Sequence, residues 1–250
     1  MEAKTINEVI AQLDEIIHQE KEALSCLAYF PILYKKVTIR IKKGIENDEF
    51  EDGARMEKLD VIFANRFIDA YRTWKAAENT TLSWRNAFEA SSENNLLILQ
   101  HLLLGINAHI NLDLGVAAAQ TVGKNADIET LKSDFDAINN VLSSMIDSVK
   151  DQISIVSPLM ILVEKFGNGN EEKLVSFSIN IARKGAWDFA KKFHNSDDEQ
   201  LEIDKRDKII GQLAHKLANP KGRIFRWLIR FIRFFEESDV KKVISALDKE

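Results

Sequence analysis

The sequence feature that most constrains the fold is the stretch QHLLLGINAHINLDLGVAAAQ at residues 100–120. Its apolar side chains occupy nearly every side of a helix, which is typical of a helix buried inside a protein. We therefore expect a central buried helix that begins near Asn94 or Asn95. The same stretch also carries polar side chains, and burying these costs free energy unless each one finds a partner. They are His101, Asn107, His109, Asn111 and Asp113.

The rest of the chain also predicts helices. Only three prolines and ten glycines interrupt 250 residues, and the alternating pattern of strands is nearly absent. Thr5 and Glu8 fit a capping box, and Pro31 suits a first helical turn. A turn is expected at 167–170. The expected helices cover about 5–27, 31–47, 54–77, a short segment from 83, 127–149, 171–194, 199–217, 221–235 and 238–248. This pattern predicts a single all-α domain of about eight to ten helices over residues 1–250, with 221–250 as a peripheral C-terminal helical arm.

Composition and charge exclude several classes of protein. The net charge of −5 argues against a general nucleic-acid binder, so no nucleic-acid partner is expected. Cys26 is the only cysteine, which excludes an intrachain disulfide and a thiolate zinc cluster. The N-terminus is acidic and amphipathic, unlike a signal peptide. No uninterrupted apolar run reaches the length of a membrane span. We therefore expect a soluble cytoplasmic protein.

Three residues of the central helix predict a metal site. His101, His109 and Asp113 recur with Gly105 at four-residue steps, so they climb one side of the helix with a slow drift. Imidazole and carboxylate ligands suit Zn, Fe or Mn, and a bound metal lowers the pKa of its water enough to make a nucleophile. The alternative is a polar network in which each side chain is satisfied by a neighbour, without a metal.

The helix expected at 54–77 supplies further candidates. Asp60 lies in the apolar context KLDVIFA, and we interpret it as a fourth metal ligand or a general base. The alternative is an ordinary helix carboxylate that pairs with Arg66 or with solvent. Asn107 and Arg66 join Asp60 as catalytic candidates that orient substrate or ligands. The candidates for substrate binding are Asn111, Asn65 and Tyr71.

The segment KGRIFRWLIRFIRFF at 221–235 combines five basic residues with many aromatic ones and has no acid. Its arginines recur at spacings of three, four and three residues and therefore line one face of a helix. They are Arg223, Arg226, Arg230 and Arg233. This composition is typical of a helix that contacts anionic lipid or a protein partner. The alternative is a terminal helix packed on the core, whose arginines reach acidic neighbours.

The motif at 100–114, together with FEDGARMEKLDVIFANRFIDA, SWRNAF, DFDAIN, SPLM and ARKGAWDFA, resembles a bacterial family catalogued only as a domain of unknown function, number five-nine-nine-five. The resemblance covers nearly the whole chain and implies one domain, without an activity. A weaker resemblance links His101 to His109 with the helices of zinc-dependent phospholipase C and P1-type nucleases. Gly105 stands where that pattern has an aspartate, and the five histidines of this chain are too few for a three-zinc site.

These observations lead to one functional hypothesis and two alternatives. We expect a metal-dependent enzyme that hydrolyses a small-molecule substrate with a metal-activated water, with His101, His109 and Asp113 as ligands. An oxygenase that uses non-haem iron fits the same two histidines and one carboxylate. A non-catalytic binding protein is the other alternative, with an apolar helical pocket and a basic aromatic helix that docks on a membrane or a partner.

Overall fold

The computed structural model describes residues 1–93, 95–160, 162 and 179–249, and within these residues the chain is helical and contains no strand. Counting α5, the π turn and α6 as one continuous helix, the described residues form ten α-helices, which confirms the predicted all-α domain. The α-helices are α1 (Ile6–Glu22), α2 (Tyr29–Glu46), α3 (Gly53–Lys75), α4 (Leu82–Glu89), α5 (Ile98–Ala108), α6 (Leu114–Val122), α7 (Lys132–Val156), α9 (Ile179–His194), α10 (Glu199–Ala218), α11 (Arg223–Phe235) and α12 (Val240–Leu247).

Short-range signals set the helix ends. The Thr5 hydroxyl caps α1 by accepting a hydrogen bond from the backbone N–H of Glu8, and Asp52 caps α3 in the same way. α1 ends at Glu22, earlier than expected, because the chain turns through a left-handed conformation at Leu24. Asp127 caps a short 3₁₀ turn, Ile128–Leu131, that leads directly into α7. Pro158 follows the end of α7, as the restriction on residues before proline predicts.

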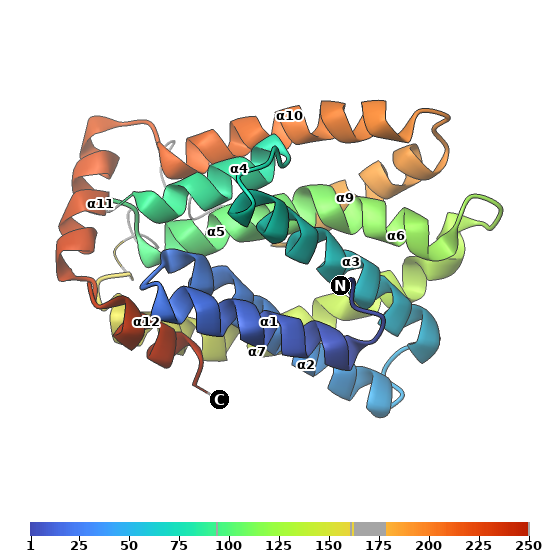
Figure 1. Ribbon diagram of the computed structural model, residues 1–250, viewed down its shortest axis with the longest axis horizontal. Coiled ribbons are helices and arrows are strands. Elements are labelled where there is room, and N and C mark those ends of the chain that lie inside the picture. The colour runs from blue at the N-terminus through green and yellow to red at the C-terminus, as the bar shows by residue number, and fades with distance from the viewer. Residues whose placement is uncertain (94, 161, 163–178, 250) are drawn as a thin grey trace.

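The central helix contains a wide turn. α5 and α6 are joined by five residues of π-helix, His109–Asp113, so that one helix runs continuously through the middle of the molecule (Figure 1). Single π turns are rare in α-helices and are frequent at functional sites. By length and composition, Ile98–Val122 would qualify as a membrane span, contrary to our sequence-based expectation, but 89% of its most apolar window is buried inside the protein. Burial on that scale is expected of a core helix.

The other helices surround this central one. α9 packs closely along α6, where a Cβ on Gly115 would come within 2.8 Å of the backbone carbonyl oxygen of Ala186. α10 lies over α4 and α5 on one side, and α1, α2 and α3 form the opposite side together with α7 (Figure 1). The largest core cluster joins α6, α7 and α9 around Phe135, Trp187 and Phe193. The result is one domain with the polar-bearing helix at its centre.

The two C-terminal helices differ in how they join the domain. α11 stands at one end of the molecule, crosswise to α10 (Figure 1), and packs one face on α5. α12 is more fully integrated, because Val243 and Ile244 are buried against Ile17 and Ile32. The description of 221–250 as a peripheral arm therefore suits α11 better than α12. The turn expected at 167–170 and the first part of the helix expected at 171–194 lie outside the described residues.

Candidate functional site

A cavity of about 480 Å³ lies between α2, α3, α5, α7 and the start of α9. Most of its lining consists of leucine, isoleucine, valine, methionine and phenylalanine side chains. Ser143, Ile146 and Asn180 line it and are also exposed to solvent, so among the described residues the cavity reaches the surface between α7 and the start of α9. Its volume falls within the range of pockets that hold small molecules in other proteins.

Three polar side chains interrupt the apolar wall at one place. Tyr34 comes from α2, Asp60 from α3 and His109 from the π turn, and all three line the cavity. Each carries a buried polar atom without a hydrogen-bond partner in the described part of the protein: the Tyr34 hydroxyl, Asp60 Oδ2 and His109 Nε2. Buried polar atoms of this kind are rare, and in a native protein they require an explanation. All three residues border the same cavity.

Stacked rings hold His109 in a fixed orientation. Its ring lies parallel to that of Phe63, with 3.5 Å between the centroids, and meets the Tyr34 ring edge-on at 4.4 Å. His109 Nδ1 lies 3.4 Å from Asp113 Oδ2. Since a carboxylate only accepts hydrogen bonds, Nδ1 carries the proton and Nε2 is left as an acceptor. Burial lowers the pKa of His109 although Asp113 opposes that shift, so the imidazole is neutral near pH 7.

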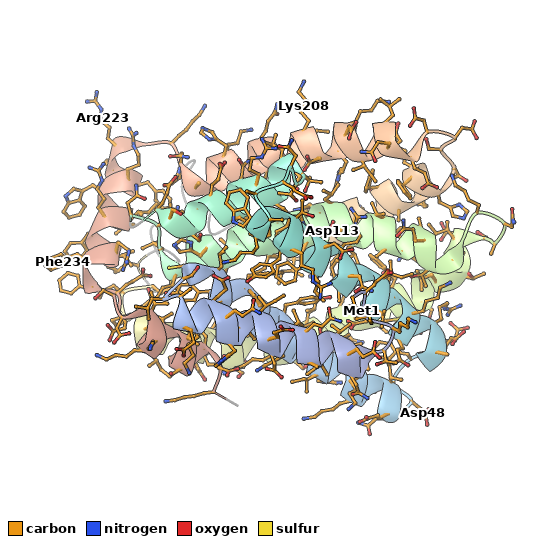
Figure 2. The ribbon with its side chains drawn as sticks, in the orientation of Figure 1. Met1, Asp48, Asp113, Lys208, Arg223 and Phe234 are labelled. Atoms are coloured by element: carbon orange, nitrogen blue, oxygen red, sulfur yellow. The ribbon has the colours of Figure 1, made fainter. Side chains whose placement is uncertain are left out.

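Asp113 is fixed by two strong donors besides His109. Arg66 Nε donates to Asp113 Oδ1 at 2.9 Å, and Trp84 Nε1 donates to Oδ2 at 2.8 Å. The carboxylate is almost fully buried at the centre of the molecule (Figure 2). A carboxylate held in this way positions the imidazole. Arg66 therefore holds the Asp113 carboxylate in place and is not among the residues that line the cavity.

Burial disfavours the charged forms of both Asp60 and Tyr34. Burial raises the pKa of Asp60 to about 7, and the nearby Glu57 adds to the shift. Burial also raises the pKa of Tyr34 well above its ordinary value, with contributions from Asp60 and Asp113. Below pH 7 the Asp60 carboxyl can donate a hydrogen bond, as can the Tyr34 hydroxyl. Below pH 7 these three side chains therefore offer two donors and one acceptor, and carry no net charge.

His101 lies apart from this group. Its ring meets the edge of Tyr29 at 5.9 Å, and burial lowers its pKa to about 4, with a further contribution from Arg233. It borders a separate space of about 20 Å³, which is room for about one water molecule. Gly105, between the two histidines, admits the Phe30 ring, because a Cβ there would come within 2.5 Å of it. The Phe30 side chain therefore packs directly against the backbone at Gly105.

The remaining predicted site residues make structural contacts away from the cavity. Asn107 donates to the backbone carbonyl of Ile210 at 3.1 Å and accepts from Asn111, which ties α5 to α10. Asn65 exchanges two hydrogen bonds with the backbone of Ala3. These three asparagine side chains hold elements together and do not line the cavity.

Tyr71 belongs to another buried pair. Its hydroxyl donates to Glu20 at 2.5 Å, and Lys75 donates to the same carboxylate. Tyr71 borders only the 20 Å³ space. The contact links α1 to α3, so the structure gives Tyr71 a role in packing two helices.

The structure thus brings together His109 and Asp113, with Asp60 in the same cavity wall as His109. In the described ranges no group of three or more His, Cys, Asp or Glu side chains is close enough to hold a metal ion. Sequence reasoning missed Tyr34 and Trp84. Trp84 lies in the SWRNAF motif that carried the family resemblance, whereas Tyr34 is one aromatic among several on an apolar helix face and gives no sequence signal.

Comparison with known proteins gives a family and no activity. No curated protein matches the chain, and no solved structure matches it. The model of the family of unknown function DUF5995 matches residues 6–220, which include Tyr34, Asp60, His109 and Asp113 and end before α11. The chain therefore belongs to the family of unknown function DUF5995.

Proposed function

We propose that this protein binds a small amphipathic molecule, with its apolar part in the cavity and an uncharged polar group against Tyr34, Asp60 and His109. The observation that carries the proposal is a largely apolar cavity whose lining includes three residues with a buried polar atom that has no partner among the described residues. An apolar cavity favours a hydrocarbon chain, because transfer of that chain from water is favourable. The polar wall fixes the orientation of the bound molecule.

The chemistry of the wall selects the polar group of the ligand. His109 Nε2 accepts a hydrogen bond, while the Tyr34 hydroxyl and the protonated Asp60 donate. A hydroxyl or an amide both donates and accepts, so either one satisfies this set. A carboxylate ligand would place an unpaired negative charge in the buried space beside Tyr34, Asp60 and His109, which costs free energy. We therefore expect long-chain alcohols or amides in preference to ionised fatty acids.

The test is a calorimetric titration with 1-decanol and with decanoate at about pH 6, where the acid is ionised and Asp60 is mostly protonated. We expect 1-decanol to bind at least about tenfold more tightly than decanoate, and His109→Phe to remove that preference. The Asn65→Ala variant is the control, because Asn65 contacts the Ala3 backbone and not the cavity. No binding of either compound by the wild-type protein would contradict the proposal.

The metal-dependent hydrolase predicted from the sequence is a second candidate. The observation in its favour is that His109 Nε2 and Asp60 Oδ2 are both unpartnered at the same cavity wall. A metal there would use these two ligands, whereas Asp113 is already engaged by Arg66 and Trp84. Elemental analysis of protein purified without a His-tag or chelator tests it. Near-stoichiometric Zn, Fe or Mn that is lost in a folded His109→Ala variant would support hydrolysis, and absence of metal after reconstitution would exclude it.

A further inference from the structure

α11 presents an unusual outer surface. Its inner face is apolar and packs on the start of α5, with Phe225 and Ile232 buried beside Leu97. Its outer face is also largely apolar: Ile224 and Phe234 are each 82% exposed, and Trp227 is 65% exposed. Contiguous exposed apolar groups on a soluble protein mark a place of contact with something else. The contact surface is defined here as Ile224, Trp227, Phe231, Phe234 and Phe235, and is called the aromatic stripe.

Spacing places a second stripe beside the first. The members of the aromatic stripe recur at three- and four-residue steps, so they share one side of the helix. A row of exposed arginines has the same spacing, and each arginine lies one residue before a member of the aromatic stripe. They are Arg223, Arg226 and Arg230. Arg233 continues this row half-buried, 3.8 Å from Glu236. The outer half of α11 therefore consists of an apolar row alongside a cationic row.

The aromatic rings form a preordered platform. Trp227 stacks on Phe231 with 5.4 Å between the centroids, and Phe231 meets Phe235 at 5.1 Å. The helix stands at the end of the molecule, and the labelled side chains of Arg223 and Phe234 project away from the body (Figure 2). A broad surface can therefore approach α11 along its whole length.

We propose that α11 docks on the surface of a bilayer that contains anionic lipids. The aromatic stripe would enter the boundary between headgroups and acyl chains, and the arginines would contact lipid phosphates. Charge favours this occupant over a second copy of the chain, because pairing two α11 helices would bring like-charged arginines together. Residues 221–235 contain no acid that would repel an anionic surface. The proposal concerns a surface separate from the cavity, and holds whether or not the cavity takes a ligand.

Vesicle sedimentation of the full-length protein tests the role of the arginines. We expect binding to phosphatidylcholine vesicles that contain phosphatidylglycerol, little binding to phosphatidylcholine alone, and weaker binding as salt rises. Arg226→Glu with Arg230→Glu should weaken binding by more than about tenfold. The matched control is Lys208→Glu with Lys216→Glu, which makes the same change of charge on the exposed face of α10 (Figure 2). We expect the control to change binding less than about twofold.

Fluorescence quenching tests the aromatic stripe independently. Trp227 is the most exposed of the four tryptophans, so brominated phospholipids should quench the wild-type protein and not the Trp227→Phe variant. Absence of binding to anionic vesicles would overturn the proposal, as would equal losses in the arginine pair and the lysine pair. Sedimentation equilibrium distinguishes the other occupant: a dimer that dissociates in Trp227→Ser, without vesicle binding, would assign the surface to a second copy and overturn membrane docking.

Discussion

The cavity wall and α11 depart from ordinary globular proteins in opposite directions. At the cavity wall, Tyr34, Asp60 and His109 hold polar atoms inside an apolar interior, without partners in the part of the chain that the structure describes. On α11, Trp227 and Phe234 hold apolar rings in solvent. Buried polar atoms and exposed apolar patches are the two informative exceptions to the rule that apolar groups lie inside. Each exception is the basis of one proposal, a bound small molecule in the first case and a membrane surface in the second.

The two regions also differ in how their charges are balanced. Asp113, behind His109, forms an ion pair with Arg66 and accepts a hydrogen bond from the Trp84 indole. The outward arginines of α11 lie in a segment without acids. Substitutions should therefore have large effects on stability at the central helix and small ones on α11.

The largest effect is expected at the carboxylate that organises the central helix. Asp113→Ala leaves the Trp84 indole N–H buried without an acceptor and removes the partner of Arg66. We expect the free energy of unfolding to fall by about 3–5 kcal/mol in urea titrations. Asp69→Ala on α3 is the control, because its contact with Arg72 is an exposed pair at 3.8 Å, and should cost less than about 0.5 kcal/mol. Equal effects would contradict the assignment of Asp113 as the organising group.

The next effect depends on pH and concerns Asp60. Its pKa rises from 3.8 when exposed to about 7 in the folded protein, so the folded state binds the proton more strongly. The free energy of unfolding should therefore fall as pH rises from about 4 to about 7. The asparagine of Asp60→Asn cannot ionise. At about pH 8 the free energy of unfolding of this variant should therefore exceed that of the wild type by on the order of 2–4 kcal/mol. Near pH 4 the variant and the wild type should have the same free energy of unfolding. Urea titrations at both pH values check this, and a constant difference would refute it.

A smaller loss is expected at the close contact beneath His109. In Gly105→Ala the new Cβ would lie 2.5–2.8 Å from the base of the Phe30 side chain, which cannot move away without disturbing its neighbours. We expect a loss of about 1–3 kcal/mol in the free energy of unfolding. Gly185→Ala on α9 is the matched control, because its nearest neighbour is the flexible end of Arg206 at 3.4 Å. That variant should gain about 0.5–1 kcal/mol from helix propensity. A gain in both variants would show that Phe30 moves freely.

The smallest effect is expected on α11. Trp227→Ser removes a side chain that is 65% exposed and contacts Phe231. We expect a change of less than about 0.5 kcal/mol in thermal or urea unfolding, as for other surface positions. A loss above about 2 kcal/mol would mean that the aromatic stripe is part of the core, and the contrast between the two regions would fail.

The fold could be predicted from the sequence because the signals are local. Thr5, Pro31, Asp52 and Asp127 mark helix starts through bonds or backbone angles within a few residues, and the apolar period identifies the buried faces. The central position of residues 100–120 followed from their apolar composition alone. The end of α1 was predicted five residues late, since the left-handed turn at Leu24 has no glycine to indicate it.

The candidate site could be predicted only in part. A four-residue step drifts by about 40° around an α-helix, so two steps turn His109 by about 80° from His101. The π turn then places Asp113 beside His109. Asp60 was a candidate from its apolar context, but its position beside the cavity depends on how α3 packs. Tyr34, whose sequence neighbourhood resembles any apolar helix face, required the tertiary structure.

Ligand binding in the cavity is tested most directly by titrating 1-decanol into a variant whose cavity is filled by a larger side chain. Leu142→Trp places a large ring into the cavity from α7, whereas Ile209→Trp adds the same ring on the exposed face of α10. If the cavity is the binding site, Leu142→Trp should weaken 1-decanol binding by at least about tenfold, and Ile209→Trp should leave it unchanged. Unchanged binding in a folded Leu142→Trp protein would contradict the account.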